Sequence, residues 1–332
     1  MQFNKFIVRE PVGISRWEAR MAIRDRVKPA ILMGFLFIIM MNIPGNIILA
    51  FSGAAANMLN PWEALNQYAT AGTAGTAQGV AYNALGGMMS AMGGYLLYAL
   101  LVSGAVCLSQ ALFFLRYKRR QVAETELIFY GFRYFGKALG TFLLICVFTA
   151  AWVVLAYLPG SILGSIIIVM MPNGGGLAIG VMVIMLALAG AAALGTIKAL
   201  QYSLAYFIMA DHPDIGPLES IRISKFLMFG NRGKFFLLNL SFIGWYILAY
   251  IASNIAATPF SLILQSAGIS ATIGGQLAFM IISSVISGLC FGFLNFYRGT
   301  ATAAFYEKVR GLAPGGILPQ VPLPPSPPSP SP

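Results

Sequence analysis

Charged residues are scarce in this sequence. They make up 9% of its 332 residues, whereas soluble domains carry roughly 25%. Hydrophobic residues make up 58%, and the mean hydropathy is +0.78. The apolar runs exceed the roughly 18 residues of a membrane-spanning helix, and none alternates in polarity as barrel strands do. The composition excludes a soluble domain and a barrel, and it predicts an all-α, polytopic integral membrane protein.

Cysteine and histidine are also rare, with three residues and one residue respectively. Each cysteine lies inside an apolar run without CxxC spacing, which indicates neither a disulfide framework nor a zinc site. The histidine belongs to the turn Asp211-His212-Pro213-Asp214, where the proline disfavours helix for the residue before it. We interpret this turn as a helix stop with a solvated imidazole and expect no metal and no cofactor; metal coordination by Asp211, His212 and Asp214 is the weaker alternative.

Carboxylates are absent from every predicted span, so the proton relay of a coupled transporter has no candidate. The sequence also lacks a nucleophile elbow, a Walker loop, an HExxH motif and a pair of catalytic carboxylates. We therefore expect that the protein is not an enzyme.

Six apolar segments reach the roughly 20 residues that a bilayer requires. They cover residues 30–51, 88–115, 138–157, 177–209, 235–263 and 273–306. The apolar stretch after the third segment, up to Met171, either extends that helix past a kink at Pro159 or lies along the outer interface. The fourth segment is longer than a bilayer needs, so it either tilts or projects at its inner end.

Three regions follow from this pattern. Residues 1–29 form a basic amphipathic arm, in which Ser15 and Glu18 make a capping box that opens either a surface-lying helix or a short solvated one. Residues 30–311 form the six-helix domain, and the Pro-rich tail 312–332 is expected to be disordered. Within the domain, residues 52–87 form the longest outer loop, with a flexible linker at 69–77.

Lysine and arginine are confined to one side of the predicted membrane. Seven precede the first span, six lie between spans two and three, four between spans four and five, and two follow the sixth. The remaining two, Lys198 and Arg298, lie inside helices. The positive-inside rule then places both termini in the cytosol. Because these cations flank apolar runs, they favour anionic lipid headgroups over nucleic acid as partners.

A threefold internal repeat of helical hairpins is also predicted. A basic amphipathic segment precedes each odd-numbered span, at residues 15–28, 124–137 and 217–234, and we expect these segments to be short cytosolic helices. Two of them end in similar sequences, GFRYFGK from Gly131 and GNRGK from Gly230. Such repeats can frame a central cavity, but plain packing is the favoured interpretation.

Three motifs carry a resemblance to a known family: residues 210–245 (ADHPDIGPLESIRISKFLMFGNRGKFFLLNLSFIGW), YLPGSIL from Tyr157, and TAAFYEK from Thr302. Over residues 131–311 the sequence resembles the bacterial integral-membrane family called Domain of Unknown Function 975. The resemblance implies a polytopic protein of the bacterial inner membrane and supplies no established activity or site residues.

The candidate site residues are cations. Lys198 and Arg298 form either a cationic pair facing a polar cavity or, as we favour, two side chains that reach to the inner interface. The other candidate headgroup contacts lie in the basic segments: Arg133, Lys137, Arg222, Lys225 and Lys234.

We hypothesise a membrane-organising or accessory component that engages anionic lipids; the alternative is a permease or exporter subunit for small anionic or amphipathic solutes. Other membrane proteins or a second copy of the chain are further candidate partners.

Overall fold

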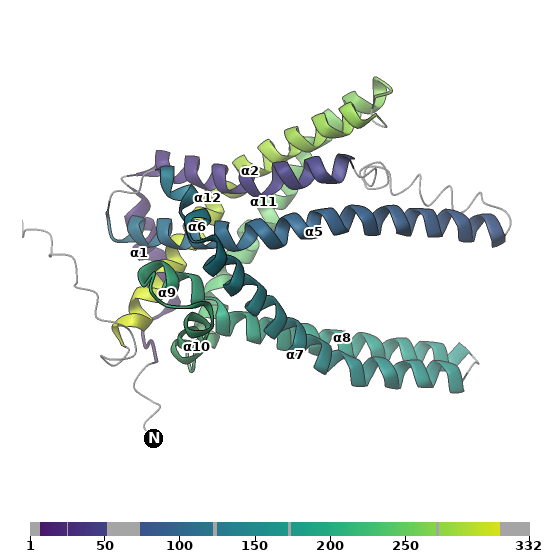
Figure 1. The fold of residues 1–332 in the computed structure, drawn as a ribbon, viewed down its shortest axis with the longest axis horizontal. Coiled ribbons are helices and arrows are strands. Elements are labelled where there is room, and N and C mark those ends of the chain that lie inside the picture. The colour runs from purple at the N-terminus through teal and green to yellow at the C-terminus, as the bar shows by residue number, and fades with distance from the viewer. Residues whose placement is uncertain are drawn as a thin grey trace, which may run out of the picture.

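The computed structural model describes residues 7–24, 26–51, 74–121, 125–171, 174–269 and 272–312. These residues form helices and contain no strand, which confirms the all-α prediction (Figure 1). Six helical segments among them are long and apolar enough to cross a membrane. The predicted tail and residues 52–73 of the predicted outer loop lie outside the described residues.

The long helices are α2 (Val27–Phe51), α5 (Ala74–Lys118), α7 (Phe135–Met170), α8 (Gly174–Tyr202) followed by α9 (Ala205–Asp211), α11 (Arg232–Ser266) and α12 (Ile273–Gly311). The short helices are α1 (Val12–Arg24), η2 (Thr125–Phe129), α6 (Tyr130–Arg133) and α10 (Pro217–Leu227). Figure 1 shows α1, α6, α9 and α10 gathered at one end of the molecule, where the described chain also begins and ends. We call this the basic end. A short helix precedes α2, α7 and α11, as the predicted hairpin unit requires, while the repeat itself stays a prediction.

Two helices are longer than the sequence predicted. Helix α7 continues through Pro159 to Met170, so the stretch after this proline extends the third span. Helix α5 begins at Ala74, which makes the prediction of a flexible linker wrong for residues 74–77 and shows that residues 74–87 are helical. Extending an existing helix costs far less than nucleating one, and alanine has the highest helix propensity, so this Ala-rich stretch joins the span that follows it.

The fourth span is broken near its C-terminal end, at the basic end of the molecule. A turn at Ser203 and Leu204 separates α8 from α9. The Ser224 hydroxyl, on α10, donates to the Gln201 carbonyl at 2.8 Å and accepts from the Leu204 amide at 3.2 Å. Because one side chain satisfies backbone groups on both sides of the break, α9 can turn into the core of the basic end without leaving those groups unpaired.

The buried core lies at the basic end, while the opposite end is apolar on its outside. Phe37, Phe113, Tyr117 and Phe296 are buried, and their rings pack at centroid distances from 4.8 to 6.3 Å. Toward the opposite end, the hairpin of α7 and α8 diverges from α2, α5, α11 and α12 (Figure 1). Its exposed side chains are large and hydrophobic, including Leu155, Ile162, Met170 and Leu186. Such a surface is suited to hydrocarbon.

The closest contacts between helices occur at small residues. This is expected in a membrane, where lipid is as apolar as the helices and close packing, not the hydrophobic effect, drives their association. A Cβ atom on Gly34 of α2 would lie 2.1 Å from the carbonyl oxygen of Gly292 on α12. In the α7–α8 hairpin, a Cβ atom on Gly164 would lie 2.7 Å from the carbonyl oxygen of Gly180. At both crossings one backbone touches another.

We predict that Gly34→Ala destabilises the protein by about 1–3 kcal/mol, because α2 and α12 must move apart to admit the new methyl group. Thermal unfolding in detergent measures the change. Gly244→Ala is the matched control, since a Cβ atom at that position of α11 meets nothing within 4 Å. Equal melting temperatures for the two variants would contradict the close α2–α12 contact.

Candidate functional site

The basic end is organised around the carboxylate of Asp211, the last residue of α9. Its side chain is only 2% exposed. One oxygen lies 2.7 Å from the Arg119 guanidinium, just after α5, and the other lies 3.2 Å from the guanidinium of Arg310 on α12. The Tyr306 hydroxyl also donates to this second oxygen, at 3.2 Å. This buried carboxylate thus joins the ends of three helices.

Glu307 supplies a second carboxylate to the same group. It lies 2.6 Å from Arg119 and 3.9 Å from Arg310. Burial alone would lower the pKa of Arg119, but its hydrogen bond to Asp211 and the charge of Glu307 raise that pKa above its usual value. Arg119 is therefore permanently charged. We refer to Arg119, Asp211, Tyr306, Glu307 and Arg310 as the Asp211 cluster.

A second set of ion pairs fixes α1 against the rest of the basic end. Glu18 on α1 lies 2.8 Å from the Lys118 ammonium and 2.9 Å from that of Lys308, and Lys308 also reaches Glu10 at 2.6 Å. Burial alone would raise the pKa of Glu18, but the hydrogen bonds from the two lysines lower it below its ordinary value. Helix α1 is therefore tied to α5 and α12 by a charged carboxylate.

Two of the predicted headgroup contacts, Lys137 and Lys234, donate hydrogen bonds to backbone carbonyls. The Lys234 ammonium donates to the carbonyls of Val8 and Glu10, and the Lys137 ammonium donates to the Pro213 carbonyl at 2.5 Å. Arg133, Arg222 and Lys225 are exposed at the surface of the basic end.

The structure places Lys198 and Arg298 in different surroundings. The Lys198 ammonium lies over the ring of Trp152 on α7, 3.7 Å from its centroid. The Arg298 guanidinium lies 5.8 Å from the ring centroid of Tyr246 and donates to Asn239 at 3.4 Å. Arg298 also lines two cavities of about 360 and 250 Å³, and Lys198 lines neither of them.

The expectation of a solvated imidazole is wrong. His212 is buried, with 4% of its side chain exposed, because the turn after α9 folds inward beside Ile208 and Ile215 of the core. Its Nε2 atom is buried, and no atom of the described residues forms a hydrogen bond with it. In the part of the chain that the structure describes, no three His, Cys, Asp or Glu side chains gather as a metal site would require.

The Asp211 cluster was not found from the sequence, because its members are up to about two hundred residues apart. The one available signal was that Asp211 and Glu307 lie in two of the three motifs that carry the family resemblance. Because acidic residues are few and basic residues are many, ion pairs are expected. The sequence does not show which basic residue pairs with each acid.

The helices, their surface and the charge at one end define a multi-pass membrane protein. The family model described as "Protein of unknown function (DUF975)" matches residues 16–313, so the chain belongs to this family, as the resemblance implied. Neither a curated protein nor a solved structure matches.

We predict that Asp211→Asn destabilises the protein by about 3 kcal/mol, because Arg119 and Arg310 lose a buried counter-charge. Chemical unfolding followed by circular dichroism measures the loss. Asp214→Asn is the control, since this exposed acid forms no ion pair with the described residues. A destabilisation of Asp211→Asn no larger than that of the control would show that the cluster does not hold the basic end together.

A pH effect follows from His212. Burial lowers the pKa of this imidazole below its ordinary value of 6.5, and the charge of Asp211 only partly offsets this. The unfolded chain therefore takes up the proton at a higher pH than the folded chain does, so stability falls as the pH drops below about 6.5. We expect melting temperatures to fall between pH 7.5 and 5.5 in the wild type and to fall less in His212→Gln. Parallel pH profiles would contradict the buried neutral imidazole.

Proposed function

We propose that this protein is a non-enzymatic component of the bacterial cytoplasmic membrane, with both termini in the cytosol, and that it organises or supports other membrane components by engaging anionic lipids. The basic end is then the cytosolic face. The proposal includes no cofactor.

One observation carries the proposal: on and next to the short helices of the basic end, large apolar side chains are exposed beside exposed cations. Phe129, Phe132 and Phe135 are exposed around Arg133. On and after α10, Leu218, Phe226 and Phe229 are exposed around Arg222 and Lys225. In water such rings would be unfavourable, but a helix half-sunk among headgroups buries its rings and presents its cations to phosphate.

The partition of charge supports the same conclusion. Four carboxylates, those of Glu10, Glu18, Asp211 and Glu307, are engaged by Lys118, Arg119, Lys308 and Arg310. Among the described residues, no carboxylate lies within 4 Å of Arg133, Arg222 or Lys225. These cations are available to anionic headgroups, at about 1 kcal/mol each near a membrane surface.

We predict that the protein retains phosphatidylglycerol in preference to phosphatidylcholine when it is extracted from vesicles that contain both in equal amounts. Arg222→Gln with Lys225→Gln should lower this preference, because two cations beside exposed rings are lost. Mass spectrometry of the co-purified lipid measures the ratio. Arg9→Gln with Arg120→Gln is the control, since it removes the same charge from exposed residues outside these helices. Retention of the two lipids in equal amounts by the wild type would refute the proposed function.

A second candidate, a permease or exporter subunit for small anionic or amphipathic solutes, is favoured by Arg298. Gln110 lines both of the cavities that share Arg298. Asn239 also lines the larger one, and Asn42 and Asn295 also line the smaller one. These neutral amides leave the arginine available to an anion. Proteoliposomes that show no flux of any anion tested, under any gradient, would remove this candidate.

A further inference from the structure

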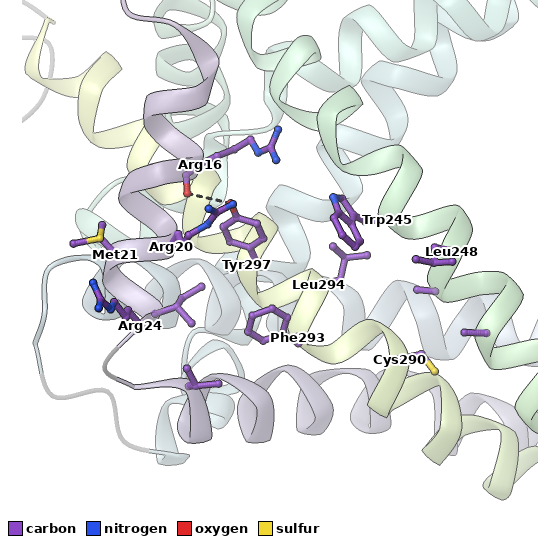
Figure 2. A pocket seen from close by; sticks show the side chains of 14 residues that line it. Arg16, Arg20, Met21, Arg24, Trp245, Leu248, Cys290, Phe293, Leu294 and Tyr297 are labelled. Atoms are coloured by element: carbon purple, nitrogen blue, oxygen red, sulfur yellow. Dashed lines mark hydrogen bonds between the residues drawn. The ribbon is translucent and has the colours of Figure 1, made fainter.

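A cavity with a volume of about 890 Å³ lies between α1, α11 and α12 (Figure 2). This is near the upper end of the about 300–1,000 Å³ that is usual for sites that bind small molecules. Arginines of α1 line one end of it, and apolar side chains of α11 and α12 line the rest. We call it the α1 groove.

Helix α1 is held rigidly over this groove. Its residues Ser15, Ala19 and Ile23 are buried, and the ion pairs of Glu18 hold it to α5 and α12. The Tyr297 hydroxyl also donates to the Arg16 carbonyl at 3.1 Å, a bond drawn in Figure 2. The groove is therefore preformed, and the backbone that carries its arginines needs little ordering to bind a ligand.

Three arginines, Arg16, Arg20 and Arg24, follow one another at intervals of four residues, which places them along one side of α1. Figure 2 shows Arg16 directed toward α11 and Arg20 directed toward Tyr297. The Arg16 guanidinium lies 5.6 Å from the ring centroid of Phe242, and its Nε atom is buried with no hydrogen-bond partner among the described residues. No carboxylate among the described residues lies within 4 Å of these arginines. The described residues therefore supply no anionic partner to this end of the groove.

The other end of the groove has the character of a membrane interior. Trp245 is 57% exposed and Leu248 is 56% exposed on α11, and Phe293 is exposed on α12 beside Cys290. Trp245 and Tyr297 lie between the arginines and the apolar part, and tryptophan and tyrosine are enriched at that level of a membrane, between headgroups and chains. The order along the groove is thus cation, interfacial aromatic and hydrocarbon.

We propose that the α1 groove binds one anionic glycerophospholipid of the surrounding membrane. Its phosphate lies at Arg16 and Arg20, and an acyl chain runs past Trp245 toward Cys290. Guanidinium groups bind phosphate through paired hydrogen bonds, and basic pockets between membrane helices bind lipid headgroups in this way. Residues 1–6 and 313–332 of this chain contain no Asp or Glu, so neither terminal segment supplies carboxylate side chains to the arginines. The inference rests on the proposed function and assigns it a particular site.

Trp245 makes the occupancy of the groove measurable. A full-length protein with Trp17→Phe, Trp62→Phe and Trp152→Phe keeps Trp245 as its single tryptophan. It is reconstituted in phosphatidylcholine vesicles that contain, at equal mole fraction, either phosphatidylglycerol or phosphatidylcholine with brominated acyl chains. Bromine quenches a tryptophan that it touches, so the ratio of the two quenching curves reports the selectivity of the groove.

We expect brominated phosphatidylglycerol to quench Trp245 in preference to brominated phosphatidylcholine. Two cations that each contribute about 1 kcal/mol would give a preference of up to about thirtyfold. In Arg16→Gln with Arg20→Gln, the preference should fall toward equal quenching, whereas the Lys variants of the same positions keep most of it. Arg9→Gln with Arg120→Gln should leave it unchanged. Ala252→Phe, which fills the apolar part of the groove, should reduce quenching by both lipids without changing the charge.

Equal quenching by the two lipids in the protein with all its arginines would overturn the inference, and so would a preference that survives Arg16→Gln with Arg20→Gln. A Trp245 that neither lipid quenches would show that another occupant, such as a segment of this chain or a second copy, fills the groove. If Trp245 shows no preference while the whole protein still retains phosphatidylglycerol, the groove fails and the proposed function stands. If the whole protein retains both lipids equally, the proposed function fails.

Discussion

Asp211 is the carboxylate on which the basic end depends, because its two oxygens bind cations that lie 92 residues before it and 99 residues after it in the chain. Removing a carboxylate from water costs several kcal/mol, and this cost is recovered only when the counter-charges are well placed. Arg119 and Arg310 provide them, and Tyr306 provides a further hydrogen bond. The positions of α5, α9 and α12 relative to one another follow from this arrangement.

The two ends of the molecule are stabilised by different interactions. At the basic end, ion pairs and a buried aromatic core hold short helices in place as they would in a soluble protein. Toward the opposite end, the helices expose large apolar side chains, and glycines such as Gly164 and Gly180 allow close helix contacts. Hydrocarbon is the solvent that such a surface requires. The α1 groove and the cavities beside Arg298 include residues close to the boundary between the basic end and the apolar part of the molecule.

Much of the fold could be predicted from the sequence, because apolar runs and one-sided charge report directly on spans. The six helices and the end of α9 at Asp211 agree with that prediction. The lengths of the helices were harder to predict, as α5 and α7 show. Neither an Ala-rich stretch nor a proline ends a helix when the residues on both sides of it are helical. The site was harder still. The spacing of Arg16, Arg20 and Arg24 is visible in the sequence, but the apolar walls opposite them come from α11 and α12, more than two hundred residues away.

The contact of Gly34 with Gly292 joins the first long helix to the last one. A ribosome makes the chain from its N-terminus, so α2 is complete long before its closest neighbour exists. Arg310 is likewise near the end of the described chain, and until it is made Asp211 has only Arg119 as a counter-charge. Helix α7 and helix α8 can pack together earlier, but α2 and Asp211 gain their last partners only when α12 is made, which makes its insertion the step that completes assembly.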